Sequence, residues 1–189
     1  MKKELKIILL TAFLEILSFW IIIPILPFIV KHFGYDARFV WITFAVSSVW
    51  MFVGGIIFGR LSDKYGRKRI LSFTVVLNLL GYLLFAFATN IWILMIARFL
   101  NWLASSWISV AQAYISDISS NKERTKNMWF IWAVFWIWMI VWPAIGSFFI
   151  QESMQFLGFV SAGIIFVNML IIWFYLKEPT KHKAHCEDP

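Results

Sequence analysis

Six apolar runs of about 20 residues each are the feature that most restricts the fold of this chain. Crossing the roughly 30 Å hydrocarbon core of a bilayer takes about 20 apolar residues, and a helix satisfies every backbone hydrogen bond within such a segment. The runs cover residues 7–30, 41–58, 70–88, 92–114, 128–150 and 156–176. We therefore predict an all-α polytopic membrane protein, with a six-helix transmembrane domain over residues 1–176 and a polar cytoplasmic tail over residues 177–189.

The composition excludes an ordinary soluble domain. Hydrophobic residues make up 61% of the chain and charged residues 14%, whereas soluble domains have about 45–50% and about 25%. The net charge of +7 is spread over short segments between the apolar runs and forms no continuous basic face of the kind that binds nucleic acid. We expect the lipid bilayer, and not nucleic acid, as a partner.

The basic residues predict how the helices are oriented. Of the 17 Lys and Arg residues, 14 lie near the termini or in the connections at 60–69 and 117–127, all on one side of the predicted bundle. Only Lys31 and Arg38 lie on the other side. Because cytoplasmic connections carry an excess of Lys and Arg, we predict that both termini are cytoplasmic and that the protein is integral to the inner, or cytoplasmic, cell membrane.

Ionisable residues within membrane helices are costly and usually functional. Glu15 lies in the first apolar run, and Arg98 and Asp117 lie within and at the end of the fourth. Glu15 and Arg98 are candidates for proton coupling, as a titrating carboxylate and a cation that tunes it. The alternative is a structural ion pair between the two helices, and Asp117 could equally be a surface acid. Asn101 and Gln112 are candidate polar positions along a substrate pathway.

The connection between the second and third runs combines glycines with an acid and bases. Gly59 is expected to permit close helix approach, and Gly66 to let the chain reverse at positive φ. Asp63 can cap or pair, while Arg67 and Lys68 offer partners to carboxylates at the cytoplasmic face. A purely topogenic basic loop is the alternative, although such a loop would need neither glycines nor an acid.

This connection resembles the signature of the major facilitator superfamily, Gly-x-Leu-x-Asp-x-x-Gly-[Arg/Lys]-[Arg/Lys], and residues 59–68 match it at every position. Full members have twelve helices in two halves around a midplane site, so the resemblance implies an amino-terminal six-helix half. It also implies a cytoplasmic latch for the outward-facing state, in which Asp117 pairs with Arg67. The predicted latch comprises Gly59, Asp63, Gly66, Arg67, Lys68, Asp117 and Arg124.

Two further segments resemble drug and tetracycline efflux antiporters of that superfamily. In the first run, Glu15 precedes Pro24 and Pro27, where the tetracycline group usually has an Asp before a Pro-x-x-Pro pair. In the fourth run, residues 98–102 resemble an Arg-x-x-x-Gly motif that the family associates with proton transfer. The resemblance therefore implies a proton-coupled role for Glu15 and Arg98.

Tryptophan stands where these motifs have glycine. The fifth run resembles the antiporter motif Gly-x-x-x-Gly-Pro-x-x-Gly-Gly, a tight helix seam; Pro143 and Gly146 match, whereas Trp138 and Trp142 replace glycines, as Trp102 does in the fourth run. A buried indole at such a seam would be overpacked. Either these residues face lipid, or they are glycines in the organism, encoded by UGA that another code reads as tryptophan. We favour the second explanation.

The resemblance implies proton-coupled efflux of a drug-like small molecule by alternating access, with a second six-helix half from the same or another chain. Two alternatives are an inactive or truncated fragment that needs a second half, and metabolite uptake within the same superfamily. No enzyme activity is expected, and no cofactor beyond the proton gradient, because no Gly-rich Lys-Ser/Thr loop for ATP phosphates is present. The His and Cys residues at 182–186 match no standard zinc spacing, so no metal site is expected.

Overall fold

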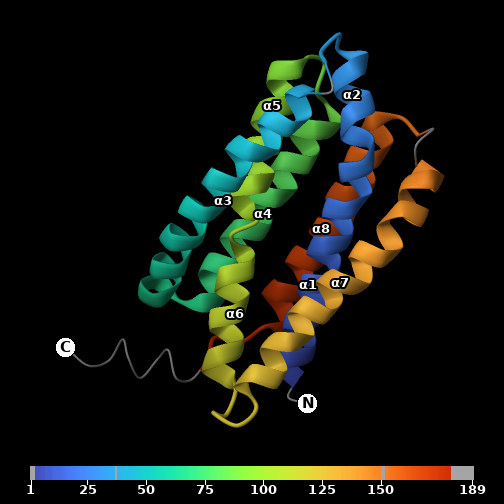
Figure 1. The fold of residues 1–189 in the computed structure, drawn as a ribbon. Helices are drawn as coiled ribbons and strands as arrows, with labels where there is room; N and C mark the ends of the chain where they lie inside the picture. The colour runs from blue at the N-terminus through green and yellow to red at the C-terminus, as the bar shows by residue number, and fades with distance from the viewer. Residues whose placement is uncertain (1–2, 37, 150–151, 180–189) are drawn as a thin grey trace.

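The computed structural model describes residues 3–36, 38–149 and 152–179, with side chains at 46 and 142–149 outside the description. Over these ranges the fold is all α, as predicted, with six long helical segments that run up and down a bundle (Figure 1). In chain order the segments are α1 (Lys3–Ile22) with η1 (Ile23–Ile25) and α2 (Leu26–His32), α3 (Arg38–Tyr65), α4 (Arg67–Ala86), α5 (Ile91–Ala104) with α6 (Trp107–Ile118), α7 (Arg124–Phe149), and α8 (Met154–Tyr175).

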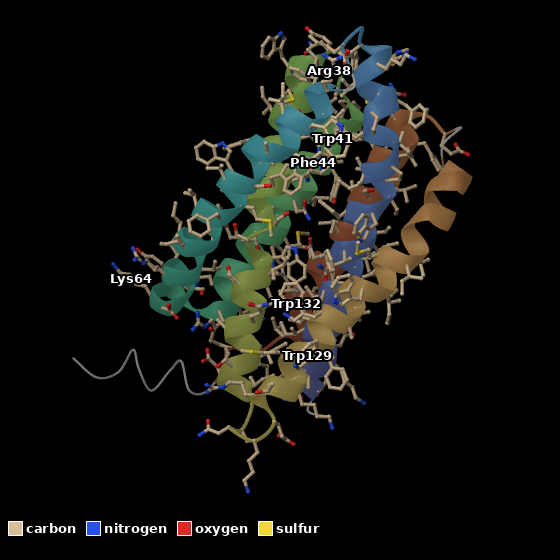
Figure 2. The ribbon with its side chains drawn as sticks, in the orientation of Figure 1. Arg38, Trp41, Phe44, Lys64, Trp129 and Trp132 are labelled. Atoms are coloured by element: carbon tan, nitrogen blue, oxygen red, sulfur yellow. The ribbon has the colours of Figure 1, made fainter. Side chains whose placement is uncertain are left out.

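Five helical stretches in the described part of the chain are long and apolar enough to cross a membrane: Lys3–His32, Arg38–Tyr65, Arg67–Ala86, Ile91–Ile118 and Met154–Tyr175. The remaining long helix, α7, has 26 residues. Arg38 and Lys64 lie at opposite ends of α3 (Figure 2), so the poorly charged and strongly basic connections occupy opposite ends of the bundle.

Two of the predicted helices are interrupted. Pro24 and Pro27 occupy the first turns of η1 and α2, and the break follows because proline has no N–H and clashes with the preceding turn. The fourth helix turns at Ser105 and Ser106, between α5 and α6. There the hydroxyl of Ser105 donates to the carbonyl of Asn101 at 3.0 Å, a side-chain bond that often bends helices.

The sequence predicted that the connection between the second and third apolar runs would span residues 59–69, and this length is wrong. Helix α3 continues to Tyr65, and only Gly66, with φ +105°, separates it from α4. The backbone N–H of Gly66 donates to the carbonyl oxygen of Ser62, as in a helix. The helical hydrogen bonding therefore continues up to Gly66, where the positive φ reverses the chain. The close-approach role expected of Gly59 is also wrong, because a Cβ there would meet nothing within 4 Å.

Close helix contact falls at other glycines. A Cβ on Gly158 of α8 would come within 2.7 Å of the Cα of Ala86 in α4. Helix α4 packs most extensively against α5 and α8, and α1 packs against α8 and α7. The centre of the bundle is therefore formed by α1, α4, α5 and α8, and these four helices carry the buried polar residues described below.

The tryptophans divide into exposed and buried groups. Trp129, Trp132 and Trp136 of α7 have exposed fractions of 65%, 44% and 55%. Trp102 and Trp138 are each only 8% exposed. The exposed group fits a surface that faces lipid, whereas the buried pair occupies space inside the bundle.

Candidate functional site

Glu15 is buried on α1, with 2% exposure. Its Oε2 accepts a hydrogen bond from Nδ2 of Asn78 on α4 at 2.6 Å, and its Oε1 accepts one from Nδ2 of Asn168 on α8 at 3.0 Å. Each carboxylate oxygen thus has an amide donor from a different helix. These donors partly replace the water that Glu15 would have at the surface, and they tie three helices to one titratable group.

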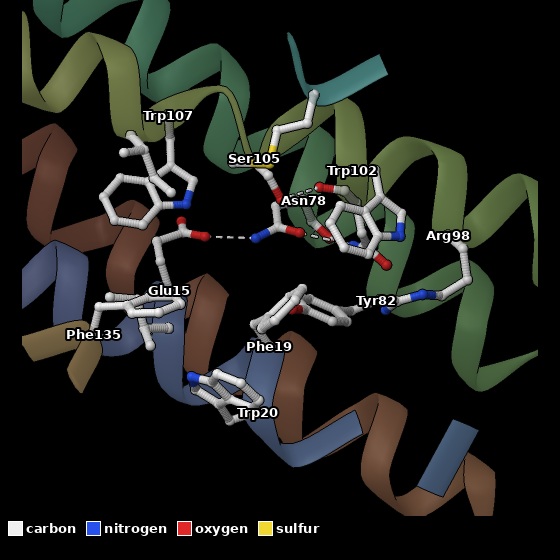
Figure 3. Close-up of a pocket in the computed structure, with 14 residues that line it drawn as sticks. Glu15, Phe19, Trp20, Asn78, Tyr82, Arg98, Trp102, Ser105, Trp107 and Phe135 are labelled. Carbon is white, nitrogen blue, oxygen red and sulfur yellow. Dashed lines mark hydrogen bonds between the residues drawn. The ribbon is translucent and has the colours of Figure 1, made fainter. Parts of the chain in front are cut away.

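A second amide extends this network to α5. Nδ2 of Asn101 donates to Oδ1 of Asn78 at 2.7 Å and to its carbonyl oxygen at 3.0 Å, while Asn78 itself donates to Glu15 along a dashed line in Figure 3. Gly81 of α4 makes room for it, because a Cβ there would lie 2.8 Å from Cγ of Asn101. Amides therefore connect α5 through α4 to Glu15.

Arg98 lies apart from this network. Its side chain is 1% exposed, and its three guanidinium nitrogens have no hydrogen-bond partner among the described residues. The guanidinium carbon lies 5.7 Å from the centre of the Trp102 ring, and Figure 3 shows the side chain beside Tyr82 and well separated from Glu15. The alternative of an ion pair between Glu15 and Arg98 is wrong in this structure, because two amides on neighbouring helices bind the carboxylate instead.

A cavity of about 220 Å³ lies between α1, α4, α5 and their neighbours. Glu15, Asn78, Arg98 and Asn101 supply polar groups to its lining, and most of the remaining wall is aromatic. Gln112, the other polar residue predicted along the pathway, is half-buried on α6 and lies outside this lining. Of the predicted residues, Glu15, Arg98 and Asn101 therefore line one cavity, whereas Gln112 does not.

Arg67 is the centre of the predicted latch. Its Nε lies 2.9 Å from Oδ2 of Asp117 on α6, its Nη2 lies 2.5 Å from Oδ1 of Asp63 on α3, and its Nη1 donates to the hydroxyl of Ser62. The Arg67 side chain is 11% exposed, against 24% for Asp117 and 64% for Asp63. Because exposed ion pairs contribute little, the bond to Asp117 is the stronger tie between helices.

Lys68 and Gly66 belong to a helix cap that was not predicted. The Glu178 carboxylate accepts hydrogen bonds from the backbone N–H groups of Arg67 and Lys68, at 2.5 and 3.0 Å. A carboxylate here satisfies N–H groups that the first turn of α4 leaves free and complements the helix dipole. A Cβ on Gly66 would come within 3.1 Å of that carboxylate. Lys68 also donates from Nζ to the carbonyl of Trp173.

Arg124 does not join this cluster. It is exposed at the start of α7, and the ion pairs of the described residues join Arg67 to Asp63 and Asp117, and Arg38 to Asp36. The start of the predicted polar tail contacts the bundle. Besides the Glu178 contacts, the carbonyl of Lys177 accepts a hydrogen bond from the hydroxyl of Tyr114. Residues 180–189, including Cys186, lie outside the described residues.

The predicted antiporter seam is described only in part. Trp138 packs against Phe13 of α1, with ring centres 4.9 Å apart, and its indole N–H has no hydrogen-bond partner among the described residues. Trp142, Pro143 and Gly146 have helical backbone in α7, but their side chains lie outside the description. The seam therefore remains a prediction.

Sequence reasoning missed Asn78, Asn168 and Glu178. The two asparagines carried a usable signal, since polar amides stand out within apolar membrane runs. Glu178 carried none, because it follows the last apolar run among other charged residues.

Comparison with known proteins identifies the family. The family model of the Major Facilitator Superfamily matches residues 8–186. The class H tetracycline resistance protein of Pasteurella multocida is 31% identical over 188 residues, which cover 97% of this chain and 47% of that protein. Multidrug resistance protein 2 of Bacillus subtilis is 27% identical over 179 residues, covering 94% and 45%.

Solved structures agree with this assignment at the level of the fold. The crystal structure of the human organic anion transporter MFSD10 (TETRAN) matches with a TM-score of 0.84 at 17% identity, covering 94% of this chain and 48% of that one. The chain spans about half the length of the curated relatives it matches. It is an integral membrane protein of several spans, and it belongs to the Major Facilitator Superfamily.

Proposed function

We propose that this chain is the amino-terminal half of a proton-coupled efflux transporter for a drug-like small molecule, with both termini cytoplasmic. The observation that carries the proposal is Glu15, a buried carboxylate beside a cavity, bound by amides from two other helices. Relatives named for tetracycline and multidrug resistance support export as the direction of transport.

Proton binding at Glu15 would change how α1 contacts α4 and α8. The ionised carboxylate accepts charge-assisted bonds from Asn78 and Asn168, and such bonds are stronger than neutral ones. Protonation removes the charge and adds an O–H that needs an acceptor. Oδ1 of Asn168 is buried without a partner among the described residues, so rotation of that amide would supply one. The proton thereby alters the contacts at the bundle centre.

The predicted latch would couple this change to the cytoplasmic end of the bundle. Arg67 ties α4 to α6 through Asp117 and to α3 through Asp63. Helices that separate at this end must first break those contacts. The latch would therefore favour the state in which the cytoplasmic side is closed, and alternating access would require its release.

The test is drug transport into inverted vesicles that contain the chain. We expect uptake of tetracycline, the compound named in the description of one relative, that a protonophore abolishes, and loss of uptake in Glu15→Gln. Glu152→Gln, at an exposed acid, is the matched control and should transport normally. Normal transport by Glu15→Gln would remove Glu15 from the mechanism. An alternative function is a fragment that is inactive by itself, because this chain covers only 47% of the class H relative. Uptake that appears only after a second six-helix polypeptide is added would support this alternative.

A further inference from the structure

We propose that Arg98 binds an anionic group of the transported molecule, which makes the cavity a site for aromatic organic anions such as carboxylates. This inference rests on the proposed function, because it assigns a substrate class to the same cavity. The observations that carry it are the isolation of Arg98 and the chemistry of the surrounding wall.

Arg98 is a buried cation without a counter-charge in the described chain. A guanidinium stays protonated and offers five N–H donors in a planar fork. Here the side chain is 1% exposed, and Nε, Nη1 and Nη2 all lack hydrogen-bond partners among the described residues. A buried charge is strongly destabilising unless it is paired, so this fork is suited to receive a carboxylate from a ligand.

The acid that lines the same cavity is already engaged. Glu15 is held at both oxygens by Asn78 and Asn168. Asp117 lies outside this lining and pairs with Arg67. The other titratable side chain that lines the cavity is Tyr82, a phenol and not a carboxylate. Among the described residues, the chain therefore leaves no carboxylate for Arg98.

The rest of the cavity indicates an aromatic ligand. Phe19, Trp20, Trp107 and Phe135 line it with Arg98, and rings of this kind pack against flat apolar bodies. Asn101 also lines the cavity, and its Oδ1 is buried without a partner among the described residues. A ligand that carries a carboxylate for Arg98 and a hydrogen-bond donor for Asn101 would satisfy both groups.

The experiment compares two probes of the same shape, 2-naphthoate and its neutral isostere 2-naphthamide. Equilibrium dialysis against the purified chain in nanodiscs, with empty nanodiscs subtracted, needs no proton gradient. The binding affinities can therefore be measured even if the chain shows no proton-coupled transport. We expect the naphthoate to bind about tenfold or more tightly than the amide, the difference that a bond to a charged group contributes.

Variants assign the preference to Arg98. Arg98→Gln should reduce naphthoate affinity to that of naphthamide and leave naphthamide binding unchanged, while Arg98→Lys should keep part of the preference. Arg38→Gln, at an arginine whose side chain is 90% exposed, should behave like the unmodified chain. The same result is expected whether residue 102 is tryptophan or glycine, because the fork belongs to Arg98.

Three outcomes would overturn the proposal. Equal affinity for the two probes in the unmodified chain would show that the cavity does not recognise charge. Equal weakening of both probes by Arg98→Gln would show a structural role. Loss of the anion preference when a second six-helix polypeptide is added would assign Arg98 to a carboxylate of that half.

Discussion

Arg67 and Asp117 form an ion pair, with 2.9 Å between Nε and Oδ2, that joins the first residue of α4 to the last turn of α6. These residues are 50 positions apart in the sequence, and they meet at the end of the bundle where the basic residues gather. The ion pair, the contact to Asp63 and the Glu178 cap all converge on the short junction around Gly66.

The pair should contribute measurably to stability. Asp117→Asn removes the charge while keeping a similar shape, and we expect it to lower the free energy of unfolding by about 1 kcal/mol. Unfolding by sodium dodecyl sulfate, followed by circular dichroism, measures this change. Asp36→Asn is the control, because its ion pair with Arg38 is exposed and 3.9 Å long. Equal effects of the two substitutions would contradict a special role for Asp117.

Gly66 and Gly59 should respond in opposite ways to alanine. Gly66→Ala places a side chain at φ +105° and against the Glu178 carboxylate, so we expect a loss of about 1 kcal/mol or more. Gly59→Ala adds a methyl group within a helix and meets nothing within 4 Å. It should therefore be neutral or stabilising by up to about 1 kcal/mol. The same unfolding assay distinguishes them, and equal losses would contradict the structure at this junction.

Asn168 should matter for transport more than for insertion into the membrane. Asn168→Ala removes the amide that donates to Oε1 of Glu15 and would accept from its protonated form. We expect proton-driven tetracycline uptake to fall about tenfold or more, with normal amounts of protein in the membrane. Asn127→Ala, which removes an amide bonded to Ser119 outside the cavity, should keep its rate. Unchanged uptake in Asn168→Ala would exclude it from proton coupling.

The tryptophan codons offer a test that needs no protein. Trp102, Trp138 and Trp142 stand where the family motifs have glycine. If glycine is the natural residue there, the gene carries TGA codons at these three positions. Exposed Trp92 and Trp173, at helix ends, should be encoded by TGG, because tryptophan is favoured at the membrane interface. Mass spectrometry of peptides from the native organism would confirm the residues directly. TGG at the first three positions would leave tryptophan as the real residue.

The fold could be predicted because its main signal is local. Each apolar run is long enough to cross a bilayer, and a spanning segment has few alternatives to a helix. Helix ends were less predictable. The run of bases after Gly59 predicted a loop, yet α3 continues to Tyr65, since charged residues at the end of a membrane helix can remain helical in water. Within this segment the helix ends at Gly66, which takes positive φ.

The sequence by itself determined the class of protein, the six helices and which residues are costly inside a membrane, because hydropathy, charge and motif spacing are properties of short segments. Only the tertiary structure decided the partners. It placed Glu15 against Asn78 and Asn168, left the Arg98 guanidinium without a hydrogen-bond partner among the described residues, and brought Glu178 to the start of α4. The physical reason is that a hydrogen bond depends on which helix faces meet, and those faces are set by packing across distant segments, such as Gly158 against Ala86.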